Sequence, residues 1–282
     1  MSLGGLTFRI FANRFWAHLP REVQIMISRG HAVVYETTLS RLFIPPYIWF
    51  QFGSFRALRR FRPASGARHY RSFQDFFVRR LAEEVRPDGE FVWPCDGLLC
   101  ESAPVTREFV VEVKGEARHV SAVFGPEFAI PEGSHFTNVF LHNSDYHRLH
   151  APVAGRITKV VRIPGELRFL RPWIYRQSPS VPALTNERVN VAIEDQSGRV
   201  WFLSFVGGPG VGTVKMLDGV GVGSVVQPGQ EIAQFLMGST CCMVSPVAPV
   251  QKVGATVVMG TSLLARPGFP ISGNNTDGDS RF

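Results

Sequence analysis

The sequence predicts an α+β protein, with amphipathic helices in its N-terminal part and a predominantly antiparallel β-sandwich or barrel-like domain after them. Two observations carry this prediction. Apolar residues recur at helical spacing before about residue 86, whereas short alternating or β-branched segments separated by glycine-rich turns follow from residue 90. The chain has 282 residues, of which 45% are hydrophobic and 19% charged, so it can bury a large core.

Helical spacing of apolar residues predicts an amphipathic helix over residues 19–30 and a second over residues 33–43, which Pro45 and Pro46 would end. Residues 56–71 are basic and contain proline, serine and glycine, a composition typical of a linker.

A further helix is expected to begin after Ser72, because S-F-Q-D at residues 72–75 forms a capping-box pattern. The same segment repeats large apolar side chains at helical spacing, and R-P at residues 86–87 would end the helix. These apolar residues are Phe73, Phe76, Phe77 and Leu81.

Strand patterns fill the rest of the chain. The D-Q-S-G run at residues 195–198 separates two β-branched segments and predicts a hairpin. Strands are expected at residues 109–113, 138–141, 156–163, 189–193 and 200–205, with further β segments within 206–226, 231–235 and 256–265. The predicted organisation is therefore a helical region over residues 1–71, a β-rich catalytic domain over residues 72–269 and a flexible tail over residues 270–282.

The positive charge lies almost entirely in the helical region. Residues 1–71 hold 11 Arg, no Lys and two acidic residues, a net charge of +9, whereas the rest of the chain carries −2. Arginine mixed with aromatic residues suits an anionic membrane surface, and we favour that partner over nucleic acid because no nucleic-acid motif is present. An arginine-rich surface over an ordinary core is the simpler alternative. No transmembrane helix is expected, since the apolar stretch at residues 42–55 is short and interrupted by prolines.

Three segments carry groups that can activate a serine. Asp96 lies in P-C-D-G at residues 94–97, and His147 and His150 lie in D-Y-H-R-L-H-A-P at residues 145–152. Ser239 follows Gly238. An acid, a histidine and a hydroxyl form the minimum set for serine activation. The surroundings of Ser239 lack the G-x-S-x-G pattern of hydrolases, so an attack on the preceding Gly238 carbonyl is the alternative to an external substrate. Each motif taken alone is also compatible with an ordinary turn. No metal site is expected.

Taken in order, these motifs resemble those of phosphatidylserine decarboxylase precursors. Gly208 stands where that family usually has Ala, and Met237 where it usually has Leu. The matching pieces are F-Q-D-F-F at 73–77, P-C-D-G at 94–97, K-G at 114–115, D-Y-H-R-L-H-A-P at 145–152, V-G-G with V-G within 206–212, and F-x-x-G-S-T at 235–240.

The resemblance implies a self-processing enzyme. Asp96 would orient His150, and His150 would take the proton of Ser239 as it attacks the Gly238 carbonyl. The chain would separate between Gly238 and Ser239 into a large chain, 1–238, and a small chain, 239–282, with Ser239 converted to a covalent pyruvoyl cofactor. His147 would then protonate the substrate carbon after loss of CO2.

The resemblance also implies phosphatidylserine as substrate, phosphatidylethanolamine as product and a homodimer. It places the enzyme peripherally on an anionic membrane, at the cytoplasmic face of a bacterial inner membrane or, as the alternative, at the mitochondrial inner membrane. Two other functions stay open at this point: a serine hydrolase that uses Asp96, His150 and Ser239 on an external acyl substrate, and a non-catalytic membrane-associated homologue.

Overall fold

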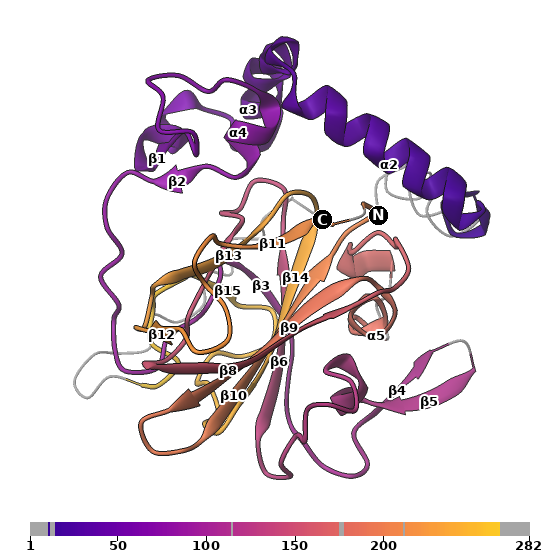
Figure 1. Ribbon diagram of the computed structural model, residues 1–282, viewed down its shortest axis with the longest axis vertical. Helices are drawn as coiled ribbons and strands as arrows, with labels where there is room; N and C mark the ends of the chain where they lie inside the picture. The colour runs from indigo at the N-terminus through magenta and orange to yellow at the C-terminus, as the bar shows by residue number, and fades with distance from the viewer. Residues whose placement is uncertain (1–10, 12–14, 114, 175–177, 211, 266–282) are drawn as a thin grey trace.

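An antiparallel sheet of eight strands lies at the centre of the structure (Figure 1). The computed structural model describes residues 11, 15–113, 115–174, 178–210 and 212–265. The strand order is β12 (Val225–Val226), β8 (Gly155–Ile163), β9 (Arg188–Asp195), β10 (Val200–Gly207), β14 (Ser239–Ser245), β6 (His135–Leu141), β3 (Gly97–Pro104) and β15 (Thr256–Val257). The α+β prediction is confirmed. Within the described residues β12 and β15 do not pair with each other, so the sheet is open and the barrel-like form is not adopted.

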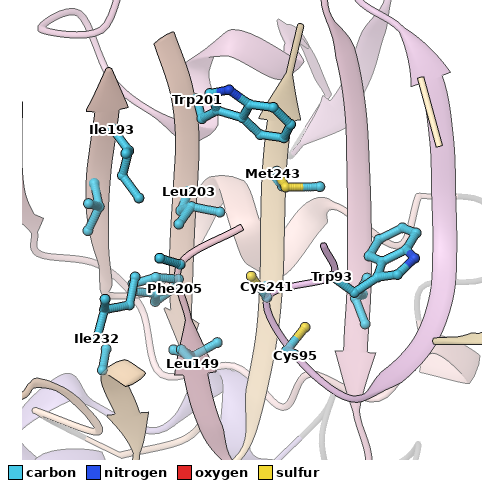
Figure 2. Packing of buried hydrophobic residues seen from close by; sticks show 14 of the residues in the cluster. Trp93, Cys95, Leu149, Ile193, Trp201, Leu203, Phe205, Ile232, Cys241 and Met243 are labelled. Atoms are coloured by element: carbon cyan, nitrogen blue, oxygen red, sulfur yellow. The ribbon is translucent and has the colours of Figure 1, made fainter. Parts of the chain in front are cut away.

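A second sheet of three strands packs against one face of the large sheet. Its order is β11 (Val214–Met216), β13 (Glu231–Phe235) and β7 (Arg148–His150). The main hydrophobic core lies between the two sheets, where Leu149 and Ile232 of the small sheet meet Leu203, Phe205 and Met243 of the large one (Figure 2). Alternation along each strand sends these side chains to one face, so the core fixes the pairing register.

The opposite face of the large sheet has a second core with its own covering. That covering consists of β4 (Val110–Val113), β5 (Glu116–His119), the 3₁₀ helix η5 (Val120–Val123) and α5 (Val181–Thr185). Phe136, Phe202 and Val244 of the large sheet pack into this core. Both faces of the central strands are therefore buried, which explains why β6, β10 and β14 contain few charged residues.

The N-terminal helical region lies above one end of the sheets in Figure 1. Its main helices are α2 (Arg21–Glu36), α3 (Ile44–Phe52) and α4 (Phe73–Phe77). Between and beside them lie η2 (Trp16–His18), η3 (Thr38–Phe43), η4 (Phe55–Arg60), β1 (Phe61–Arg62) and β2 (Arg80–Leu81), and a short 3₁₀ helix, η6 (Pro172–Ile174), follows much later in the chain. Apolar residues of α3 and α4 form a separate small core.

Two helix predictions were wrong about where helices start and end. The helix predicted over residues 33–43 does not exist as a unit, because α2 continues to Glu36 and a 3₁₀ helix follows. Pro45 and Pro46 lie in the first turn of α3 instead of ending a helix. The first turn of a helix has no partner for its N–H groups, so proline is well tolerated there.

The helix predicted from Ser72 to about Arg86 is much shorter. The Ser72 side chain caps α4 as expected, since its hydroxyl accepts a hydrogen bond from the Asp75 N–H at 3.1 Å. However, α4 ends at Phe77, and Leu81 pairs with Phe61 in a two-stranded ladder. The segment predicted as a linker over residues 56–71 therefore contains structure, including β1.

Candidate active site

Ser239 is the first residue of β14, in the middle of the large sheet. It pairs with Gly207 of β10 on one side and with Leu141 of β6 on the other. Its side chain is fully buried, and its Oγ has no hydrogen-bond partner. Most buried polar groups are paired, because an unpaired one costs about 1–3 kcal/mol. The hydroxyl of Ser239 is therefore neither solvated nor held by a hydrogen bond, a state that it shares with the Ser204 hydroxyl on the neighbouring strand.

Hydrogen bonds to both backbone groups of Leu236 fix the turn that precedes Ser239. The Leu236 N–H donates to the Thr213 carbonyl at 2.7 Å, and the Leu236 carbonyl accepts a hydrogen bond from the Gln74 side chain at 3.1 Å. Gly238 has a φ of +41°, in the left-handed region that favours glycine. A side-chain carbon at Gly208 would lie 3.1 Å from both the Cα and the carbonyl oxygen of Gly238, so the backbones approach closely here.

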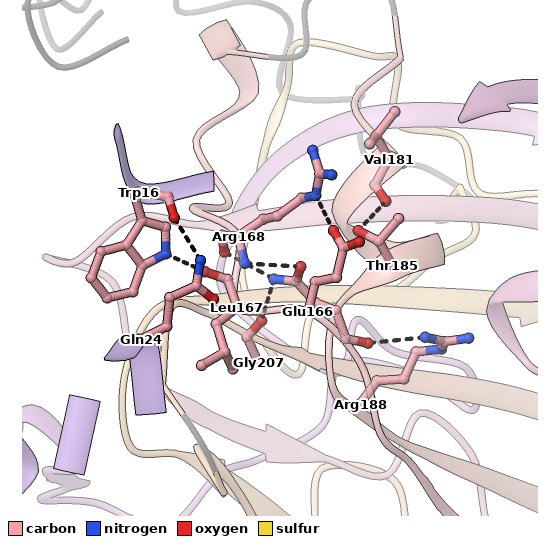
Figure 3. Close-up of polar contacts among 10 residues, drawn as sticks. Trp16, Gln24, Glu166, Leu167, Arg168, Val181, Thr185, Arg188 and Gly207 are labelled. Atoms are coloured by element: carbon pink, nitrogen blue, oxygen red, sulfur yellow. Dashed lines mark hydrogen bonds and ion pairs between the residues drawn. The ribbon is translucent and has the colours of Figure 1, made fainter. Parts of the chain in front are cut away.

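The end of β10 that pairs with Ser239 is supported from the N-terminal region. The Asn186 side-chain amide donates to the Gly207 carbonyl and to the Arg168 carbonyl, both at 2.9 Å. Next to Arg168, the Leu167 carbonyl accepts a hydrogen bond from the Trp16 indole at 2.6 Å (Figure 3). The 3₁₀ helix η2 is therefore tied to the loop between β8 and β9, which contacts this end of β10 through Asn186.

His147 lies just before β7, and its ring packs against Phe77 with 4.1 Å between the ring centres. Its Nδ1 lies 2.8 Å from the Asp145 carbonyl, which can only accept, so Nδ1 carries the proton. The remaining nitrogen, Nε2, is buried and has no partner. The side chain thus keeps a free lone pair, as a proton acceptor requires.

His150 has the same tautomer with different partners. Its Nδ1 lies 2.6 Å from the Gly229 carbonyl, and its Nε2 lies 3.2 Å from the Tyr146 hydroxyl. That hydroxyl is also 3.1 Å from the Glu231 carboxylate, so its single hydrogen can serve only one of the two acceptors at a time.

Both histidines are neutral in the folded chain. Burial away from water, which disfavours the charged imidazolium, lowers the pKa of His147 from 6.5 to about 3 and that of His150 from 6.5 to about 4. The Arg79 charge adds to the effect on the pKa of His147.

The free energy of unfolding is expected to fall as the pH decreases from about 6.5 to about 4. The unfolded chain binds protons on both histidines in this window, whereas the folded chain does not, so each contributes up to about 1.4 kcal/mol per pH unit. Urea titrations of Ser239→Ala at several pH values measure the slope. His147→Gln in that background should reduce it, and an unchanged slope would contradict the assignment.

Asp96 precedes β3 and has partners other than the histidines. Its Oδ1 accepts a hydrogen bond from the Met259 N–H at 2.9 Å, and its Oδ2 lies 3.4 Å from the Arg60 guanidinium. Burial raises the pKa of the Asp96 carboxyl, and the Met259 N–H and Arg60 oppose this. The backbone N–H of His150 donates to the Pro94 carbonyl at 2.9 Å, which brings the motif at residues 145–152 beside the motif at residues 94–97. Within the described residues, however, no hydrogen bond links Asp96 to His150 or His150 to Ser239.

Two buried arginines were not predicted as part of the site. Arg79 donates from Nη2 to the carbonyls of Ser144 and Asp145, both at 2.6 Å, and so supports the loop that holds His147. Arg148 donates to the Glu231 carboxylate at 2.8 Å, and its side chain is only 2% exposed. Arg148 belongs to the motif at residues 145–152, and Arg79 follows the motif at residues 73–77, but neither pattern shows that a charged residue is buried.

Two sizeable cavities lie elsewhere. One of about 740 Å³ lies between the start of α2 and residues 164–168, and one of about 660 Å³ lies beside residues 121–128. None of the four predicted site residues lines either cavity. In the part of the chain that the structure describes, no cluster of three or more His, Cys, Asp or Glu side chains is arranged to hold a metal ion.

Comparisons with known proteins place the chain in a family. The family model described as phosphatidylserine decarboxylase matches residues 73–265, a range that contains all four predicted site residues. The chain belongs to the phosphatidylserine decarboxylase family. Membership confirms the predicted resemblance and identifies the chain as a decarboxylase.

Two relatives illustrate the similarity, and both are named phosphatidylserine decarboxylase proenzyme. The protein of Verminephrobacter eiseniae (strain EF01-2) is 31% identical over 206 residues, which cover 64% of this chain and 71% of the relative. The protein of Azoarcus sp. (strain BH72) is 30% identical over 198 residues, covering 63% of this chain and 68% of the relative.

Proposed function

We propose that the protein is a phosphatidylserine decarboxylase that cuts its own chain between Gly238 and Ser239 and makes its pyruvoyl cofactor from Ser239. The observation that carries the proposal is the fully buried, unpartnered Oγ of Ser239, directly after a glycine in a left-handed conformation. A hydroxyl that is neither solvated nor hydrogen-bonded is free to react, and the adjacent carbonyl of Gly238 is the acyl group nearest to it along the chain.

In the proposed cleavage, Ser239 Oγ attacks the Gly238 carbonyl carbon and its proton passes to a base, so the amide becomes an ester as the Gly238–Ser239 C–N bond breaks. Removal of the Ser239 α-proton then expels the Gly238 carboxylate. Water replaces the nitrogen of residue 239, which leaves as ammonia. The two chains end at residue 238 and begin at residue 239.

His150 is the proposed base for Ser239, with Asp96 as the carboxylate that orients it, and His147 is the proposed acid that protonates the substrate carbon. Two features support the base role of His150: its ring is neutral, and its Nδ1 is bound to a carbonyl, which leaves Nε2 as the basic nitrogen. His147 has the same neutral form, so it must take up a proton at Nε2 before it can act as an acid. Asp96 must exchange its present partners, Met259 and Arg60, for His150 to fill its role.

When present, the pyruvoyl group would condense with the substrate amine and accept the electrons released as CO2 departs, the task that pyridoxal performs in other decarboxylases. The fold supports a stable pair of chains after the cut. β14, at the start of the proposed small chain, lies between β10 and β6 of the large chain and pairs with both.

The N-terminal helical region is the proposed membrane-binding surface. In helix α2 the uncharged polar residues Gln24 and Ser28 are buried, whereas the apolar residues Met26 and Ile27 are exposed together with charged residues such as Arg29. An exposed apolar surface of this extent marks an interaction site. The exposed large apolar residues in this region are Phe11, Phe15, Met26, Ile27, Val33, Val34, Leu39, Leu42, Phe43, Trp49, Phe50 and Phe55.

Exposed arginines accompany these side chains and suit a negatively charged lipid such as phosphatidylserine. In the described residues, no helix has both the length and the apolarity needed to cross a membrane. The exposed apolar and arginine side chains support the peripheral attachment that we propose, at the cytoplasmic face of a bacterial inner membrane or at the mitochondrial inner membrane. A homodimer is the proposed working form.

Replacing Trp49 and Phe50 with serine is expected to weaken binding to vesicles that contain phosphatidylserine by about 10- to 100-fold, because two large exposed rings no longer enter the lipid interface. Flotation of the protein with vesicles measures this. Val222→Ser removes an exposed apolar side chain from the β domain and should leave binding unchanged. Equal loss in both proteins would contradict the assignment of the surface.

The proposed activity is tested with phosphatidylserine labelled at the serine carboxylate and presented in vesicles. The wild-type protein should release the label as CO2, and prior treatment with a carbonyl-specific reagent such as hydroxylamine should abolish the release. An uncut protein that releases no CO2 but reacts with a fluorophosphonate would overturn the proposal in favour of a serine hydrolase.

A further inference from the structure

A buried row of polar side chains lies behind the proposed cleavage site, on the face of the large sheet opposite Ser239. It starts at Thr240 on β14, continues through Asn138 on β6 and reaches Glu101 on β3. Ser180, just before α5, closes the row. Thr240, Asn138 and Ser180 are between 0 and 4% exposed. The same strands contribute hydrophobic residues to the second core, and burying polar side chains in such surroundings is costly, so the row requires an explanation.

Hydrogen bonds join the members of the row, and the single hydrogen of the Thr240 hydroxyl serves only one of its two acceptors at a time. The Thr240 hydroxyl lies 2.8 Å from Asn138 Oδ1 and 2.8 Å from the Val139 carbonyl. Asn138 Nδ2 donates to Glu101 Oε2 at 2.9 Å, and the Ser180 hydroxyl donates to the same oxygen. A carboxylate only accepts, so the NH2 of Asn138 must face Glu101 and its carbonyl must face Thr240. The row therefore has one fixed direction.

The row connects the two chains that the proposed cleavage would create. Thr240 belongs to the small chain, and the other members belong to the large chain. The sheet register brings Glu101 opposite Asn138 on one side and Cys242 opposite Asn138 on the other, so the three strands meet in the row.

Thr240 takes on a larger structural role once Ser239 has reacted. The conversion proposed above removes the backbone nitrogen of residue 239, which can then no longer donate a hydrogen bond to a neighbouring strand. Thr240 becomes the first residue of β14 that keeps a backbone N–H. Because successive side chains of a strand point to opposite faces, fixing the Thr240 side chain on one face fixes residue 239 on the other.

We infer that Asn138 and Glu101 are positioning residues that hold the reactive residue 239 in place through Thr240, both during cleavage and in the two-chain enzyme. This inference rests on the proposed function. None of the three residues touches the reacting atoms in the account given above. They act by fixing the start of β14.

The test compares Thr240→Val, which keeps the side-chain shape but removes the hydroxyl, with Thr240→Ser, which keeps the hydroxyl. Thr240→Val is expected to slow cleavage by at least about tenfold and, in cut protein, to lower kcat by at least about tenfold with little change in KM, since a buried hydrogen bond is lost. Thr240→Ser should restore both rates to within about threefold. Amide hydrogen exchange of residues 240–245 in the cut protein should be faster in Thr240→Val alone.

Thr137→Val is the matched control, because Thr137 is a fully buried threonine on β6 outside the row. It should be cut and should turn over at the wild-type rate. If the wild-type protein is cut and Thr240→Val is cut and turns over at the same rates, this inference is overturned but the proposed function stands. Equal defects in Thr240→Val, Thr240→Ser and Thr137→Val would also overturn this inference, since a general loss of packing would explain them. An uncut wild-type protein would overturn the proposed function and this inference with it.

Discussion

Ser239→Ala is expected to remain a single intact chain under conditions in which the wild-type protein separates completely into two. The substitution removes the only hydroxyl proposed to attack the Gly238 carbonyl, and water cannot take its place at a side chain that is 0% exposed. Loss of the nucleophile in comparable systems costs several orders of magnitude in rate, so no cut is expected within days. Electrophoresis of the denatured protein over time measures the result.

Ser204→Ala is the matched control for this variant. Ser204 lies on β10, next to β14, and its hydroxyl is also fully buried and has no partner, but it pairs with Cys242 rather than with the cleavage turn. This control should be cut at the wild-type rate. Cleavage of Ser239→Ala at an undiminished rate would show that another group makes the cut.

Arg79→Met is expected to lower the free energy of unfolding by about 3 kcal/mol, measured by urea titration in the Ser239→Ala background. The carbonyls of Ser144 and Asp145 would lose a charged donor in a fully buried position, at about 1–3 kcal/mol each, and the saved cost of burying the charge offsets part of this. The guanidinium also lies over three aromatic rings, at 4.5–5.4 Å from their centres.

The free energy of unfolding of Arg79→Lys should lie between those of the unsubstituted protein and Arg79→Met, because an ammonium group keeps the charge but cannot reproduce the planar contacts of the guanidinium. Arg107→Met tests an arginine on the surface, where the side chain is 87% exposed, and is expected to change stability by less than about 0.5 kcal/mol. If the substitutions at residues 79 and 107 changed stability by similar amounts, the hydrogen bonds of Arg79 to the Ser144 and Asp145 carbonyls would not be stabilising the fold.

The strands were predicted well where the signal is local. The segment predicted at residues 231–235 is β13, Glu231–Phe235, and the predicted hairpin turn forms with Gly198 at a φ of +75°. In that turn the Asp195 side chain accepts hydrogen bonds from the N–H groups of Ser197 and Arg199. Alternation and turn residues determine such elements within a few residues of sequence.

The helical region was predicted less well, because contacts between residues far apart in the sequence determine where its helices end. Leu81 has the right spacing to continue α4, yet it pairs with Phe61, 20 positions earlier in the chain. The sequence pattern showed that α2 has an apolar face, but not whether that face points toward the protein or toward solvent. Gln24, a polar residue, is buried instead, and its side chain donates to the Trp16 carbonyl at 2.6 Å. A periodic pattern identifies a face and does not say whether protein or lipid covers it.

For the proposed active site, the motifs supplied the candidate side chains but not their partners. The sequence places His147 and Ser239 in recognisable patterns, and the structure shows both as buried groups with an unpartnered atom. Arg60 contacts Asp96 from 36 positions away, and Asn138 contacts Thr240 from 102 positions away. Asn138 lies in an apolar strand outside every motif, so only the sheet register shows its place behind the proposed cleavage site.

The mass of the purified, denatured wild-type protein tests the central claim most directly. The account predicts two fragments, one ending at Gly238 and one beginning at residue 239, and the second should be lighter by one ammonia than the peptide that simple hydrolysis would give. A single chain with the full mass of residues 1–282 would contradict the account, as would a small fragment that begins with an unmodified serine.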